Sequence, residues 1–319
     1  MFDTLVEKLK KDPKTIVFTE GPDARILEAT ARIKAEGIMK VVLVGNVAEV
    51  EAAAKKGGFD IEGVEIIDPE TYAEMDAMVA KMVELRKGKM TPEQCKANLL
   101  KGNYFGTMLV KMGKADCLLG GATYSTADTV RPALQLIKTK PGNSIVSSCF
   151  IMVKDDQKLA MGDCAINIAP NEDELVEIAV ETAKTAKVFG IDPKVAMLSY
   201  STYGSGKGDM VTLVANATKK IKEAAPDLAV DGELQFDAAV APEVAKVKCA
   251  GSPVAGQANT FIFPDINAGN IGYKIAARLG GYEAIGPVLQ GLNAPINDLS
   301  RGCNAEEVYK MALVTAALS

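Results

Sequence analysis

The sequence lacks two residue types altogether: its 319 residues include no histidine and no tryptophan. Without histidine, one chain cannot build a Ser–His–Asp or Cys–His nucleophile pair, and it cannot form an HExxH metal motif. Most zinc sites are excluded for the same reason. A general base must therefore come from aspartate, glutamate, lysine, tyrosine or cysteine. We predict chemistry without histidine and no metal site.

Several classes of protein are excluded by what is scarce. The chain contains no run of about 18 apolar residues, so no membrane span is predicted. Its charged N-terminal segment does not resemble a secretory signal. The net charge is −5, and no basic stripe indicates a nucleic-acid surface. The cysteines are scattered singly, so we expect no disulfide framework. The sequence therefore predicts a cytoplasmic protein with neither nucleic acid nor a membrane as a partner.

What is present is typical of a globular protein. Hydrophobic residues make up 48% of the chain and charged residues 24%, and this length favours two domains over one. In the first part of the chain, strand-like apolar runs alternate with segments of helical periodicity. One such helix is expected to begin after Asp23 and to end at Gly37. This alternation predicts a parallel sheet with helices on both faces. The expected strands are 15–19, 40–44, 64–67 and 115–119.

A turn cluster at 140–143 marks a candidate domain boundary. We predict two three-layer α/β/α domains with mainly parallel sheets. Domain I comprises residues 1–141 plus 295–319, and domain II residues 142–294. The last helix is expected to return to domain I. Strands are expected at 144–153, 159–164, 196–199, 228–230, 260–263 and 288–289. Helices are expected at 126–137, from Asn171 onward with a capping box, and at 208–224, 236–247, 267–279 and 304–318.

The most informative segment is the block 286–303. It places Ser300, Arg301 and a glycine directly before a helix start at Asn304. A helix N-terminus offers unpaired N–H groups and a positive dipole end, which suit a small anion. The arginine fork matches carboxylate or phosphate oxygens, and the serine hydroxyl can donate to a developing oxyanion. A polar loop closing a strand–helix connection is the alternative interpretation.

Four separated blocks carry a resemblance to a known family: TEGPDARIL, GGATYSTADTVRPALQ, FPDINAGNIGYK and PVLQGL…PINDLSRGC. In this order along the chain they resemble the phosphotransacetylases (phosphate acetyltransferases). The resemblance implies a homodimeric two-domain α/β enzyme with its active site in the interdomain cleft. It implies the reaction acetyl-CoA + phosphate = CoA + acetyl phosphate, by direct thiol attack in a ternary complex. Neither a tightly bound cofactor nor a covalent acyl-enzyme is implied.

The resemblance also implies catalytic roles. Ser300 would contact the acetyl carbonyl, and Arg301 the phosphoryl group. The family pattern places an aspartate seven residues after the serine as the base for the CoA thiol, and this chain has Glu307 there instead. Glu307 also completes a capping box with Asn304, so base and cap compete for one carboxylate. Asp298 is a further nearby carboxylate.

Six further residues are predicted to bind substrate, each with a structural alternative. Arg86 and Arg131 would contact CoA or phosphate, or they are solvated cations at helix ends. The hydroxyls would meet phosphate or cap a helix. The pair from the NAGNIGYK segment would contact ligand or serve helix packing. Arg25 is a weaker candidate of the same kind. The six are Arg86, Arg131, Ser125, Thr126, Asn270 and Lys274.

Two further motifs give weaker evidence of function. The GSGKG segment around Lys207 lacks both the first glycine and the Ser/Thr of a P-loop, so nucleotide hydrolysis is rejected. Cys303 precedes a helix, where a thiol pKa falls, yet the family uses no acyl-cysteine. Two rival functions stay open: a phosphate butyryltransferase, and a non-catalytic domain that senses acyl-CoA.

Overall fold

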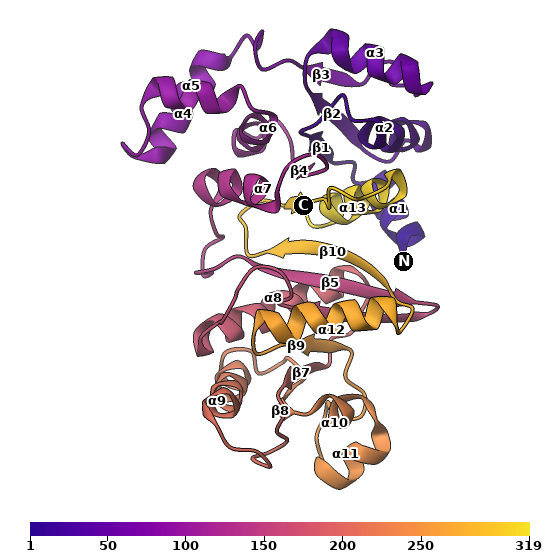
Figure 1. The fold of residues 1–319 in the computed structure, drawn as a ribbon, viewed down its shortest axis with the longest axis vertical. Coiled ribbons are helices and arrows are strands. Elements are labelled where there is room, and N and C mark those ends of the chain that lie inside the picture. Colours follow the sequence, from indigo (N-terminus) through magenta and orange to yellow (C-terminus); the bar gives the residue numbers. More distant parts are fainter. The chain divides into compact units, whose positions relative to one another are not determined.

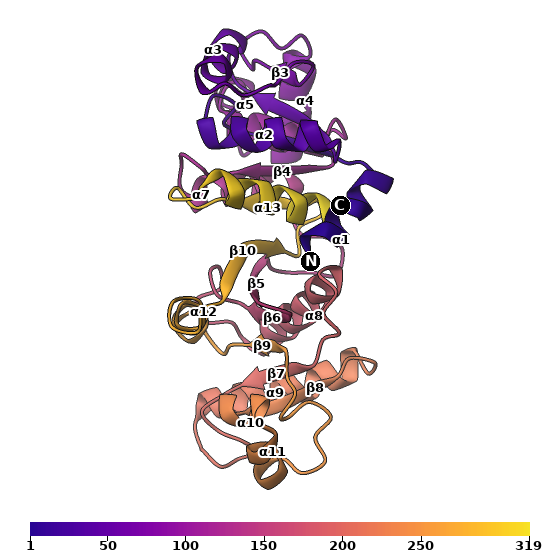
Figure 2. The same cartoon turned by 90° about the vertical axis from the view of Figure 1, so that its right-hand side faces the viewer.

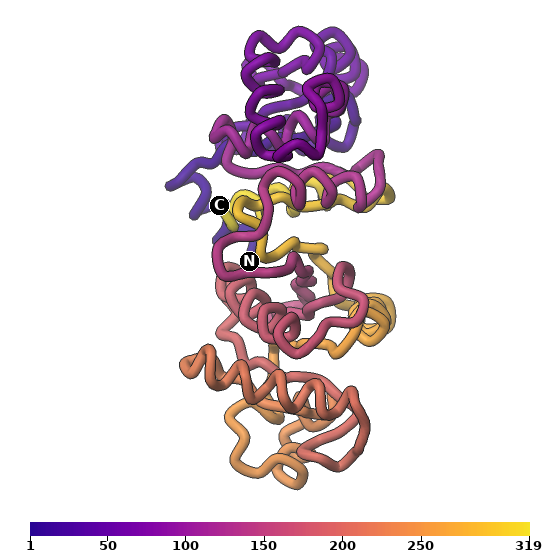
Figure 3. Tube along the Cα trace, turned by 90° about the vertical axis from the view of Figure 1, so that its left-hand side faces the viewer, coloured from indigo at the N-terminus to yellow at the C-terminus, as the bar shows by residue number.

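The computed structural model describes all 319 residues, which form two compact units (Figure 1). Unit 1 comprises residues 1–141 and 292–319, and unit 2 comprises residues 142–291. The chain leaves unit 1 once and returns to it. Both termini therefore belong to unit 1 (Figure 3), where the Lys8 Nζ donates a hydrogen bond to the Ala317 carbonyl at 3.1 Å.

The sheet of unit 1 has five parallel strands in the order β11-β4-β1-β2-β3. Its central strands are apolar and almost wholly buried, as is typical of a sheet covered on both faces. The bounds are β1 Thr15–Phe18, β2 Lys40–Val44, β3 Glu65–Ile67, β4 Cys117–Gly120 and β11 Ile296–Asp298.

Helices cover both faces of this sheet. One face carries α2 (Ala24–Glu36), α3 (Val47–Gly57) and α13 (Ala305–Ala317), and Figure 2 shows α2 and α13 along the same side. Asp23 caps α2 and Gly37 ends it with φ +62°, as the sequence predicts. The terminal helix α1 (Phe2–Lys11) contacts α13. The other face carries α4 Met75–Arg86, α5 Pro92–Leu99, α6 Gly102–Lys111 and α7 Thr126–Pro132.

The sheet of unit 2 is mixed, in the order β10-β5-β6-β9-β7-β8. β10, β5 and β6 pair antiparallel, while β6, β9, β7 and β8 pair parallel. The two strands expected at 144–153 and 159–164 correspond to the antiparallel pair β5–β6. The bounds are β5 Ser147–Lys154, β6 Gln157–Gly162, β7 Val195–Leu198, β8 Val230–Leu234, β9 Thr260–Ile262 and β10 Glu283–Gln290.

Two apolar cores lie on the two faces of this second sheet. One is formed with α8 (Glu172–Val188) and α9 (Asp209–Ala224), and the other with α10 (Phe236–Val240), α11 (Pro242–Lys248) and α12 (Ile266–Arg278). Unit 2 is therefore a three-layer α/β/α unit like unit 1. No helix of the structure combines the length and the apolar composition that crossing a membrane requires.

The structure departs from the sequence-based expectation in four places. The expected helix 236–247 is two helices, because Pro242 cannot continue the first one and instead begins the second. The expected helix 126–137 is α-helical only to Pro132 and continues as the π-helical turn η1 (Ala133–Ile137). The helix α1 and the short strand β11 were not predicted.

Candidate active site

Three neighbouring strands of unit 1 end at the same edge of the sheet. β11, β4 and β1 are adjacent and parallel, so the connections that follow them emerge side by side. These are residues 299–304, 121–125 and 19–23. In open α/β sheets, ligands bind outside the carboxyl ends of the strands. The edge formed by these three connections is therefore the candidate site.

Buried acids hold this edge together. The Glu20 carboxylate accepts hydrogen bonds from the N–H of Gly121 at 3.0 Å, and from the N–H and hydroxyl of Thr123 at 2.6 and 2.8 Å. Glu20 was not predicted, although an acid directly after a buried strand is a recognisable signal. Glu20 thus fixes the connection after β4 against the one after β1.

Asp298 has a similar supporting place at the end of β11. Its two carboxylate oxygens accept the hydroxyls of Thr126 and Thr129, each at 2.5 Å. Burial raises the pKa of Asp298 above its ordinary value, against the opposing effect of these hydroxyls. Gly121 lies so close, with φ +99°, that a Cβ there would stand 2.2 Å from Asp298 Oδ1. The Thr126 hydroxyl, predicted to bind substrate, is thus engaged with Asp298.

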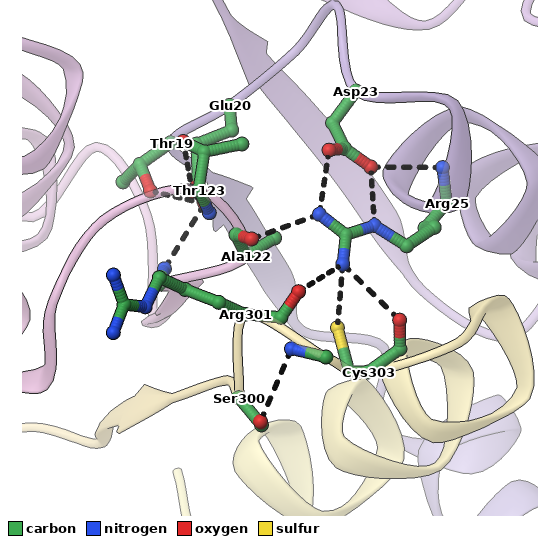
Figure 4. Close-up of polar contacts among 11 residues, drawn as sticks. Thr19, Glu20, Asp23, Arg25, Ala122, Thr123, Ser300, Arg301 and Cys303 are labelled. Atoms are coloured by element: carbon green, nitrogen blue, oxygen red, sulfur yellow. Dashed lines mark hydrogen bonds and ion pairs between the residues drawn. The ribbon is translucent and has the colours of Figure 1, made fainter.

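Ser300 and Arg301 lie in the exposed connection that follows β11. The Ser300 Oγ accepts a hydrogen bond from the Gly302 N–H at 3.2 Å, and its own hydroxyl proton has no protein acceptor. Figure 4 shows the Arg301 side chain extending away from the Arg25 guanidinium, and no dashed line reaches its own guanidinium. The two groups that the sequence singled out are therefore the ones that the fold leaves open.

Arg25 has the opposite environment, although the sequence suggested it as a ligand contact. Its Nε and Nη2 donate to Asp23 at 3.0 and 2.8 Å, and Nη2 also donates to the Ala122 carbonyl at 2.8 Å. Its Nη1 donates to the carbonyls of Arg301 and Cys303 at 2.8 and 3.1 Å (Figure 4). The guanidinium is thus occupied by protein acceptors rather than open to an anion.

The ion pair with Asp23 keeps this cluster charged. Partial burial alone would raise the pKa of Asp23, but hydrogen bonds and charge from Arg25 outweigh it, and the pKa lies below its ordinary value. The hydrogen bonds that Arg25 donates to Asp23 raise the pKa of Arg25 in turn.

Glu307 forms the capping box that competed with its catalytic role in the sequence. Its Oε2 accepts the Asn304 N–H at 3.0 Å, while the Asn304 side chain accepts the Glu307 N–H at 2.9 Å. The residue is exposed, and its second oxygen stays open. Cys303 is buried, and burial raises its thiol pKa, which disfavours a nucleophilic thiolate.

Comparison with known proteins decides the family. The family model described as "Phosphate acetyl/butaryl transferase" matches residues 1–316. The chain belongs to this family. It is 55% identical to a phosphate acetyltransferase of Bacillus subtilis (strain 168) over 317 residues, which are 99% of this chain and 98% of the relative.

Solved structures agree with this assignment. A phosphotransacetylase from Streptococcus pyogenes matches with a TM-score of 0.97 and 55% identity, over 99% of this chain and 97% of that one. A phosphotransacetylase from Staphylococcus aureus matches with a TM-score of 0.94 and 51% identity, over the same shares. The α/β fold of this transferase family is thus shared over nearly the whole chain.

Two predicted arginines of unit 1 act electrostatically on the same residue of α6. The charges of Arg131 and Arg86 both act on Tyr104, whose pKa burial raises and these charges lower. The Arg86 Nε is buried without a hydrogen-bond partner. Arg131 Nη1 lies 3.3 Å from an oxygen of Asp128, whose other oxygen accepts the Ser125 hydroxyl at 2.7 Å. The structure thus places both arginines within electrostatic range of Tyr104 and joins Ser125 to Arg131 through Asp128.

The remaining two predicted residues belong to unit 2. Asn270 and Lys274 lie one turn apart on α12. The Asn270 side-chain amide donates to the Cys164 carbonyl at 3.1 Å, which anchors the helix to the connection after β6. Lys274 is exposed, with its Nζ 5.8 Å from the ring centre of Tyr273. Nowhere in the structure are three or more Asp, Glu or Cys side chains gathered as metal ligands.

Proposed function

We propose that this chain catalyses the reversible transfer of an acetyl group between coenzyme A and inorganic phosphate. The observation that carries the proposal is the unpaired Arg301 guanidinium beside the Ser300 hydroxyl on one exposed connection. A guanidinium fork binds phosphate oxygens in pairs, and a hydroxyl proton without an acceptor is available to a substrate oxygen. Family membership and near full-length relatives named phosphate acetyltransferase support the same activity.

In the mechanism that we propose, the thiol of CoA attacks the carbonyl carbon of acetyl phosphate. The S–C bond forms, the carbonyl oxygen gains negative charge, and Ser300 donates a hydrogen bond to it. The C–O bond to phosphate then breaks, and phosphate departs with its charge held by Arg301. The thiol proton goes to a carboxylate, for which Glu307 has an open oxygen. A free thiol has a pKa near 8.5, so a weak but well-placed base suffices.

We also propose that the other predicted residues bind CoA. Arg86 and Arg131 supply the positive charge that an acidic protein needs for a ligand with several phosphates. Ser125 lies on the connection that follows β4, and Asp128 joins it to Arg131. Thr126, Asn270 and Lys274 stay predicted substrate contacts, although the Thr126 hydroxyl and the Asn270 amide already have protein partners. No tightly bound cofactor is required. The six cysteines are all buried and unpaired, which supports a reducing compartment such as the cytoplasm.

A homodimer is part of the proposal. On α12, Ile271, Ile275 and Leu279 recur every four residues and are 57%, 53% and 85% exposed. Ile275 also lines an apolar cavity of about 800 Å³, together with the half-exposed Phe236 of α10. Exposed apolar surface of this kind is typical of interfaces, and a second copy of the chain is the partner that we propose. Sedimentation of the wild type and of Leu279→Lys tests it, because the charge should shift a dimer toward monomer.

The function is tested by phosphate-dependent release of free thiol from acetyl-CoA, with butyryl-CoA in parallel. We expect turnover that prefers acetyl-CoA and falls strongly in Ser300→Ala with the fold intact. A preference for butyryl-CoA would assign the chain to the sister activity. Tight binding of acetyl-CoA without turnover would indicate a sensor and contradict the proposal.

A further inference from the structure

Arg25 reaches three connections at the carboxyl edge of unit 1. It lies in the first turn of α2, and its side chain contacts the connections after β4 and β11 as well as its neighbour Asp23. Apart from the Asp23 carboxylate and the Cys303 sulfur, every acceptor of its N–H groups is a main-chain carbonyl. A side chain that binds carbonyls fixes the path of the backbone and not the side chains upon it.

Two of these carbonyls belong to peptide units that also touch the predicted catalytic groups. In a trans peptide unit, the carbonyl and the following N–H point in opposite directions. Arg25 holds the Arg301 carbonyl, and the opposite N–H, that of Gly302, donates to Ser300 Oγ at 3.2 Å. Arg25 also holds the Cys303 carbonyl. There the opposite N–H, that of Asn304, donates to Glu307 Oε2 at 3.0 Å.

Little else fixes the first of these peptide units. Residues 300–302 are exposed, and Gly302 has no side chain to pack. A Cβ built at Gly302 would meet no atom closer than the Ser300 Oγ at 3.8 Å. The buried Leu299 and Cys303 hold the two ends of the segment, and the Cys303 N–H closes a turn by donating to the Ser300 carbonyl at 2.9 Å. A turn with glycine at its third position allows either orientation of its central peptide, so Arg25 is the contact that orients the peptide between Arg301 and Gly302.

We infer that Arg25 is a positioning residue, which orients the Ser300 hydroxyl and the Glu307 carboxylate through these two peptide units. The inference rests on the proposed function for the roles of Ser300 and Glu307. Because the Gly302 N–H occupies a lone pair of Ser300 Oγ, the hydroxyl proton is left to point at a substrate oxygen. Asp23 holds the guanidinium plane in place from the other side and offsets its charge, so substrate phosphate is left to Arg301.

The test compares Arg25→Gln, Arg25→Lys and Arg25→Ala with the wild-type enzyme. Misplacing catalytic groups by about 1 Å costs about 10²-fold in rate, so we expect kcat to fall by about that factor. KM for phosphate and CoA should change by less than about threefold, because Arg25 contacts neither. Lysine should not restore kcat, since an ammonium cannot reproduce the planar fork. Added ethylguanidinium should restore part of the kcat of Arg25→Ala.

Arg32 is the matched control on the same helix. It stacks on Tyr309 at 3.6 Å from the ring centre and pairs with Glu306 at 2.5 Å, so it too joins α2 to the segment after β11. It touches side chains of α13 and no carbonyl of the 300–304 connection. Arg32→Gln should therefore lower thermal stability while kcat stays within about twofold. Equal losses of kcat in the Arg25 and Arg32 variants would reduce Arg25 to a structural tie and overturn the inference.

A second measurement does not depend on turnover. Hydrogen exchange of the 300–305 segment should be about five- to tenfold faster in Arg25→Gln, which corresponds to the net value of about one hydrogen bond. Exchange there should be unchanged in Arg32→Gln. If the wild type showed no turnover, the proposed function would fail, and exchange alone would decide the role of Arg25. Unchanged exchange in Arg25→Gln would refute it.

Discussion

At the carboxyl edge of the unit 1 sheet, the Ser300 hydroxyl proton has no protein acceptor, and the Arg301 guanidinium forms no hydrogen bond or ion pair. At the corresponding edge of the unit 2 sheet, the two buried acids Asp163 and Glu233 already accept hydrogen bonds from the protein. Asp163 accepts the Ser148 hydroxyl and the N–H groups of residues 165, 166 and 167, while Glu233 accepts the Ser201 hydroxyl at 2.9 Å. Both carboxylates are buried.

The comparison distinguishes side chains that stabilise the fold from side chains that remain available to a substrate. A buried carboxylate whose oxygens are all engaged stabilises its connection and has nothing left to offer a substrate. In unit 1, Glu20 and Asp298 stabilise their connections in the same way, and we call such carboxylates supports. The open groups of Ser300 and Arg301 lie on the connection that follows Asp298. Burial and charge alone therefore do not mark a reactive residue in this protein. We propose that unsatisfied hydrogen-bonding capacity at a sheet edge does.

The largest effect expected from this comparison is that of Arg301→Ala. Removing a group that stabilises developing charge costs roughly 10²- to 10³-fold in kcat/KM, while thermal stability should hold, because the guanidinium makes no contact within the protein. Assays of thiol release and thermal unfolding check both. Lys207→Ala, which removes an exposed cation from the connection after β7, is the matched control and should leave kcat/KM unchanged. A loss of stability in Arg301→Ala without a loss of rate would break the comparison.

Asp163→Ala should instead lower the stability of the protein. It leaves several buried donors without an acceptor, including the Asn167 side-chain amide that donates at 2.6 Å. We expect the free energy of unfolding to fall by about 3 kcal/mol, as measured by urea unfolding. Asp156→Ala, at an exposed turn of the same unit, should change it by less than about 0.5 kcal/mol. A loss below about 1 kcal/mol for Asp163→Ala would mean that the carboxylate is not a support.

Glu307→Gln tests a residue that lies on both sides of the comparison. Glutamine keeps the capping box, so stability should change little. If the carboxylate accepts the thiol proton, kcat should fall by about 10²-fold. Raising the pH toward the thiol pKa should recover part of the lost rate, because the thiolate then forms without a base. An unchanged kcat would leave Glu307 with the cap alone.

The smallest expected effect sharpens the account of the supports. Asn keeps the helix cap in Asp23→Asn but loses the charge that faces Arg25. The pKa of Asp23 is lowered in the folded state, so its contribution to stability is complete above its unfolded pKa of about 3.9 and is lost as the pH falls through the folded pKa. We expect a gap of about 1 kcal/mol between wild type and variant at pH 7. In urea unfolding the gap should shrink below about pH 4; a gap that stays constant down to pH 3 would contradict the ion pair.

Local patterns predicted the parts of this molecule that local forces determine. The cap at Asp23, the stop at Gly37, and the apolar strands β1 and β2 all follow from short-range chemistry. The Ser300–Arg301 pair could also be found, because its residue types and the following helix start are contiguous. Strand β11 escaped notice because it is three residues long, two of them polar, and its strand character comes from pairing with β4.

The supports could not be predicted for a related reason. The Arg25 acceptors are carbonyls, which every residue has, and those of Arg301 and Cys303 lie 276 and 278 positions along the chain. No pattern of side chains in the sequence indicates a hydrogen bond to a main-chain carbonyl so far along the chain. The partners of Glu20 are likewise main-chain and hydroxyl groups a hundred residues away.

The path of the chain between the two units also sets an order of events during synthesis. Residues 1–141 emerge from the ribosome without β11 and α13, which complete their sheet and cover one face of it. At about 5–20 residues per second, translation of the intervening 142–291 takes about 8–30 s. Unit 2 is continuous and can fold during that interval, while the first segment waits with an open sheet edge. Every nascent chain therefore lacks Ser300, for which we propose the contact to the acetyl carbonyl, until its last segment is made.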